Sequence, residues 1–67
     1  MNIFPISQNQ YHLIFPGMHQ VQVFEVQGKL LLSSAMNEQM NLELSGFSKG
    51  LYVVVIDGNH VKKLMRQ

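Results

Sequence analysis

The chain has 67 residues, so it forms at most one domain, which we place over residues 1–67. A net charge of +1 with only 13% charged residues excludes the clustered basic surface of nucleic-acid binders, and 46% hydrophobic residues argue against disorder. The absence of cysteine excludes disulfides and cysteine-ligated zinc.

The first half of the chain predicts short β-strands, because β-branched and aromatic residues alternate and no apolar pattern has helical spacing. Ile3-Phe4 followed by Pro5 fits an edge strand, since proline cannot donate to a ladder. Residues 11–15 read as a second strand that ends at Pro16-Gly17. Residues 20–26 read as a third; they carry apolar side chains on both faces, which predicts a partly covered strand or a β-bulge.

The middle of the chain predicts a hairpin and a further strand. Gln27-Gly28 is expected to be a two-residue primed turn leading into the strand Lys29–Ser34. Residues 36–39 are mostly polar and are expected to be a loop. Residues 40–44 alternate apolar and polar side chains, which is typical of a half-buried strand.

The last third predicts a final hairpin. Residues 51–56 are apolar on both faces and are expected to form the central, most buried strand. Asp57-Gly58-Asn59 then predicts a tight turn into a basic strand, His60–Arg66. About seven short strands in all indicate an antiparallel sandwich or barrel, and edge strands at both termini favour an open sandwich.

Three stretches of the chain resemble one known family. They are Val-Gln-Val-Phe-Glu-Val-Gln-Gly-Lys-Leu-Leu (21–31), Leu-Glu-Leu-Ser-Gly-Phe-Ser-Lys-Gly-Leu-Tyr (42–52), and Asp57-Gly58-Asn59 followed by Lys62-Lys63. In this order they resemble the type IX (Por) secretion system C-terminal sorting domain, over essentially the whole chain. The opening Phe4-Pro5-Ile6-Ser7 departs from the family's Tyr-Pro-Asn-Pro.

The resemblance implies a function without catalysis. Members are immunoglobulin-like antiparallel β-sandwiches from bacteria of the Bacteroidetes lineage, and they carry a fused cargo through an outer-membrane translocon. The expected partners are that translocon, a sortase-like protease and an upstream cargo domain, with no cofactor and no small-molecule substrate. The expected route is transit through the periplasm and then the cell surface or secretion, with any cleavage site upstream of the folded domain.

The resemblance also implies a recognition element in the last hairpin. Its expected members are Gly50, Tyr52, Gly58, Lys62, Lys63, Leu64 and Met65. The residues themselves leave other roles open. Tyr52 also fits a packed aromatic whose hydroxyl bonds to the backbone, and the two lysines also fit protection of a strand edge against aggregation.

The residues also bear on functions other than sorting. His12, His19 and His60 are too scattered for a local metal motif, and no nucleophile or phosphate-binding motif is present, so we expect neither a metal site nor an enzyme. The alternatives are a small adhesion or carbohydrate-binding module and a structural dimerisation module. A homodimer through exposed strand edges is also expected, because the core is small.

Overall fold

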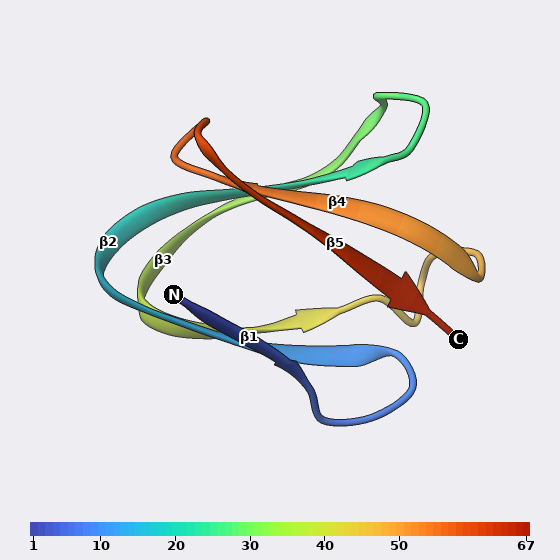
Figure 1. Ribbon diagram of the computed structural model, residues 1–67, viewed down its shortest axis with the longest axis horizontal. Helices are drawn as coiled ribbons and strands as arrows, with labels where there is room; N and C mark the ends of the chain where they lie inside the picture. Colours follow the sequence, from blue (N-terminus) through green and yellow to red (C-terminus); the bar gives the residue numbers. More distant parts are fainter.

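The computed structural model describes residues 1–67 as an antiparallel, all-β domain (Figure 1). Its strands are β1 (Asn2–Pro5), β2 (Gln10–Glu25), β3 (Leu30–Glu43), β4 (Gly50–Ile56) and β5 (His60–Arg66). The structure contains no helix that could cross a membrane. The predicted all-β antiparallel class is confirmed.

The predicted number of about seven strands is wrong, because two long strands replace four short ones. Strands β2 and β3 run through the expected break points, Pro16-Gly17 and Met36–Gln39. There, residues 15–17 of β2 lie opposite the single residue Glu38 of β3. Gly17 and Glu38 have φ angles of 100° and 69°. Surplus residues of this kind bend a strand pair without ending it, so the signals read as breaks mark a bend.

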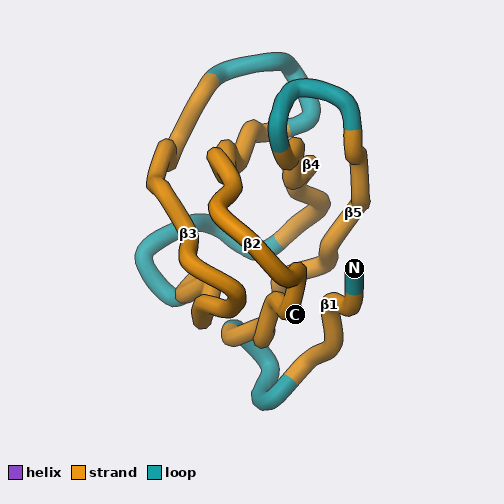
Figure 2. Tube along the Cα trace, turned by 90° about the vertical axis from the view of Figure 1, so that its left-hand side faces the viewer, coloured by secondary structure: helices purple, strands orange, loops and turns teal.

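Strand β2 is the centre of the sheet. Its N-terminal part pairs with β1 on one side and β3 on the other, and its residues 21–25 lie between β3 and β4. Strand β5 then pairs with β4, which gives the order β1-β2-β4-β5 with β3 beside β2. Because β2 and β3 bend together, the sheet curls over itself as a half-barrel (Figure 1), and Figure 2 looks onto the outside of this bend. An immunoglobulin-like sandwich of two separate sheets is not confirmed, because one sheet forms both layers.

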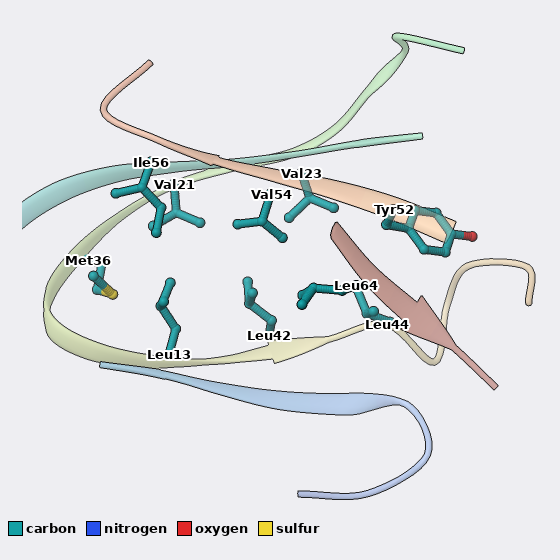
Figure 3. Close-up of a cluster of buried hydrophobic side chains, with 10 residues drawn as sticks. All are labelled: Leu13, Val21, Val23, Met36, Leu42, Leu44, Tyr52, Val54, Ile56 and Leu64. Carbon is teal, nitrogen blue, oxygen red and sulfur yellow. The ribbon is translucent and has the colours of Figure 1, made fainter. Parts of the chain in front are cut away.

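Ten buried side chains form a single hydrophobic core inside the curl (Figure 3). They are Leu13, Val21, Val23, Met36, Leu42, Leu44, Tyr52, Val54, Ile56 and Leu64. The half-buried pattern expected for residues 40–44 is confirmed, since Leu42 and Leu44 are buried while Asn41 and Glu43 are exposed. Strand β4 buries one face only: Leu51 on the other face is exposed. The expectation that β4 is the central strand is therefore corrected, because β2 has that place and the outer face of β4 is only half-buried, at Val53 and Val55.

The β2–β3 hairpin has a different turn from the one expected. The Gly28 N–H donates to the Glu25 carbonyl at 2.9 Å. Within this loop only Gly28 has a positive φ, of 99°. A primed two-residue turn at Gln27-Gly28 is therefore wrong; a longer loop closed by a left-handed glycine joins the strands. Just beyond it, Leu31 is an extra residue of β3 opposite the step from Val23 to Phe24, which confirms the predicted bulge near this strand.

Candidate recognition surface on the C-terminal hairpin

The two faces of β5 separate the residues predicted for recognition. Leu64 lies opposite Tyr52 of β4 in the register, so it faces the core, and only 7% of it is exposed. Met65 lies on the outer face and is 46% exposed. Lys62 and Lys63 lie on opposite faces of the strand, as its period of two predicts, and both are exposed. Leu64 therefore anchors the strand, while the lysines and Met65 are presented to solvent.

Tyr52 is a packed aromatic, as one of the two interpretations of the sequence predicted. Its ring lies 5.6 Å from that of Phe47, centroid to centroid, and the residue is buried. Its hydroxyl donates a hydrogen bond to the carbonyl of Ser48. A tyrosine hydroxyl bonded to the backbone a few residues upstream is the tyrosine-corner contact of β-sandwich proteins. The contact holds the loop before β4 against the start of that strand.

Two glycines shape the ends of β4. Gly50 has a φ of 143° and Gly58 a φ of 74°, and no atom lies within 4 Å of a Cβ built on either. Each is therefore needed for its backbone conformation and not for space. In the β4–β5 turn Asp57 also has a positive φ, of 55°, and the Asn59 N–H donates to the Ile56 carbonyl at 3.2 Å. These are the features of a type I′ turn, which matches the right-handed twist of the strands it joins.

The end of β5 is fastened to the opposite layer by contacts that the sequence did not predict. The Tyr11 hydroxyl of β2 donates to the Met65 carbonyl at 2.7 Å and accepts from the Met65 N–H at 3.3 Å. Arg66 Nε donates to the Leu44 carbonyl at 3.0 Å. The Gln67 N–H donates to the carbonyl of Gln8 at 3.3 Å. These contacts join the end of β5 to segments far away in the sequence.

The β4–β5 turn is fastened in a similar way to the bend of β2. Asp57 accepts a hydrogen bond from the Gln20 N–H at 2.9 Å, and its other carboxylate oxygen lies 2.5 Å from Nδ1 of His19. The ring of Phe15 stacks on His19 with centroids 3.8 Å apart and meets the ring of His60 edge-on at 5.2 Å. No local pattern predicts this cluster, because its members are far apart along the chain: His19 and Asp57 are separated by 38 positions.

Comparison with known proteins identifies the family. Residues 2–67 match the secretion system C-terminal sorting domain, and the match covers all five strands. The chain belongs to this type IX sorting-domain family. No curated protein and no solved structure matches it.

The general function of the chain follows from its membership in the family. A type IX sorting domain is the C-terminal part of a cargo and a signal for export by the type IX machinery, to the cell surface or into the medium. The family is not known for catalysis. The sorting domain has no pocket, and no three His, Cys, Asp or Glu side chains are grouped as metal ligands are. His12 contacts the side chains of Asn41 and Gln39 instead.

The charges on β5 of the sorting domain are unpaired. The His19–Asp57 contact is the one ion pair in the structure, so neither Lys62 nor Lys63 has a carboxylate partner. Both ammonium groups are exposed, where they are free to meet an acidic surface. The terminal strand therefore offers two exposed lysines without carboxylate partners, on an edge strand of fixed orientation.

His19 is held in a form that favours the charged ring. Nδ1 faces the Asp57 carboxylate, and Nε2 lies 2.8 Å from the Pro16 carbonyl oxygen, so both nitrogens face acceptors. Only the imidazolium carries N–H groups on both nitrogens. The hydrogen bond to Asp57, and after it the Pro16 carbonyl, raises the pKa of His19. The hydrogen bond from His19, and after it the Gln20 N–H, lowers the pKa of Asp57.

These two shifts define a pH window for the contact. A raised pKa of His19 gives stability that is complete below the unfolded pKa of about 6.5 and is lost as the pH rises through the folded pKa. A lowered pKa of Asp57 gives stability that is complete above about pH 4 and is lost as the pH falls through the folded pKa. The His19–Asp57 contact therefore stabilises the domain most between about pH 4 and pH 6.5.

Proposed function

We propose that the chain directs a fused cargo through the outer-membrane type IX translocon, and that the translocon reads the C-terminal hairpin. The observation that carries this is the arrangement of β5, an edge strand whose buried Leu64 fixes the exposed Lys62, Lys63 and Met65 in place. A recognition element needs such a rigid support, because a mobile segment would lose conformational entropy on binding.

The seven predicted residues then divide into two groups. Lys62, Lys63 and Met65 meet the translocon directly, since they are exposed on the terminal strand. The remaining members act by positioning: Tyr52 and Leu64 pack the hairpin on the core, and Gly50 and Gly58 give the backbone its shape at the two ends of β4. Substitution in the first group is expected to affect export without affecting folding.

The later steps of export are part of the same proposal. The cargo lies upstream of the domain, crosses the periplasm with it and is delivered to the cell surface. A sortase-like protease then cuts upstream of β1 (Asn2–Pro5), and the cargo is attached to the surface or released.

A charge-reversal experiment in a host with a type IX system tests the proposal. The domain is fused to the C-terminus of a secreted reporter, and Lys62 and Lys63 are both changed to Glu. The matched control changes Lys29 and Lys49 to Glu, which alters the net charge equally at exposed positions outside β5. We expect the first variant to lose most surface delivery and the control to keep it. Equal delivery by both variants would show that β5 is not what the translocon reads.

A further inference from the structure

The outer edge of β5 has free backbone hydrogen-bonding groups at Val61 and Lys63, whereas those of Met65 are already bonded. The N–H and carbonyl of Met65 both bond to the Tyr11 hydroxyl, so they point away from β4. Backbone groups alternate in direction along an antiparallel strand, so Lys63 and Val61 also point theirs away from β4. Since β5 lies at the end of the strand order, no further strand pairs with them.

Tyr11 sets where this open edge stops. Its hydroxyl occupies both outward groups of Met65, and the next residues are engaged by Leu44 and Gln8. An incoming strand can therefore bond to Val61 and Lys63 but must stop before Met65. A short open edge of this kind limits the length and the register of any partner strand.

The charges beside the open edge indicate the kind of strand that fits. Lys62 and Lys63 flank it on opposite faces of the sheet, and neither has a carboxylate partner. Opposite charges across a strand pair are stabilising and like charges are destabilising, so an acidic segment is favoured. A second copy of the chain is disfavoured: two open edges meeting antiparallel would pair Val61 with Lys63 of the copy, and so place Lys62 opposite its own counterpart.

We propose that the open edge of β5 pairs with one extended, acidic segment of a protein of the secretion machinery, and that Tyr11 ends this pairing at Lys63. The proposal rests on the proposed function, which it deepens by naming the class of partner and the residue that limits its register. It is recognition by strand addition, in which main-chain hydrogen bonds bind and side-chain charges select.

Amide hydrogen exchange on the 67-residue chain tests the pairing. The probe is a synthetic peptide of alternating Glu and Val, and the matched control peptide has Lys in place of Glu. At saturation the acidic peptide is expected to slow exchange of the Val61 and Lys63 amides roughly tenfold and to leave Met65 unchanged. No protection, or equal protection by both peptides, would overturn the proposal. Protection that rises with protein concentration alone would show pairing between copies and would also overturn it.

The Tyr11→Phe variant tests the limit on register. It keeps the ring and removes the hydroxyl, so the Met65 amide is expected to exchange faster in the free chain and to be slowed by the acidic peptide. The Tyr52→Phe variant is the control, because its hydroxyl bonds to Ser48 and not to β5. If the peptide still leaves Met65 unprotected in Tyr11→Phe, Tyr11 does not set the limit.

The export assay separates this inference from the proposed function. If charge reversal at Lys62 and Lys63 abolishes peptide pairing and surface delivery continues, the proposed function fails and the open edge stands. If delivery is lost while the unsubstituted chain never pairs with the acidic peptide, the strand-addition inference fails and the sorting role stands.

Discussion

Adjacent residues of β5 allow a test of which side chain anchors the terminal strand. Truncating a buried leucine to alanine costs about 2–5 kcal/mol, and Leu64 is 7% exposed on an edge strand, so we expect about 2–3 kcal/mol for Leu64→Ala. Met65 is 46% exposed on the other face, so Met65→Ala is expected to cost under about 1 kcal/mol. A domain of this length has a total stability of about 3–10 kcal/mol, so the first loss is a large share of the whole.

Urea unfolding followed by far-ultraviolet circular dichroism measures both variants. The expected result is a clear fall in midpoint for Leu64→Ala, a small one for Met65→Ala, and similar slopes for both. Leu64→Met, which nearly keeps the volume, is expected to recover most of the loss and to restore export of a fused reporter. Equal losses for the two alanine variants would refute the assignment of faces. Failure of Leu64→Met to restore export despite normal stability would mean that the leucine itself is read.

Three further predictions concern the rest of the hairpin. The free energy of unfolding should fall as the pH rises above about 6.5, because His19 then loses the proton that pairs it with Asp57. The His19→Gln variant removes the imidazolium and should abolish this fall. A fall that persists in the variant would show that another group causes it. Gly58→Ala should cost about 1–2 kcal/mol, because its φ is 74°, and lower Tm by several degrees. Gly46→Ala, with no positive φ, should be neutral, and equal effects would contradict the argument. Tyr52→Phe should cost about 1 kcal/mol in urea unfolding, and no change would mean that its hydrogen bond is replaced by water.

Sequence reasoning located the strands well where local signals were sufficient. Alternation and turn residues predicted β1, β4 and β5 almost at their observed bounds, and three motifs in order predicted the family. The period of two also placed Lys62 and Lys63 on opposite faces. It did not distinguish Leu64 from Met65, because both are apolar and either could have faced the core.

The sequence by itself determined the all-β class, the family and the place of the terminal hairpin, since alternation, turn glycines and motif order are local properties of the chain. Only the tertiary structure decided that Pro16-Gly17 and Glu38 bend one long strand pair instead of ending it. It alone also brought the Tyr11 hydroxyl to Met65 and His19 to Asp57. These contacts join residues far apart along the chain, and such hydrogen bonds form only when the register of the whole sheet is set.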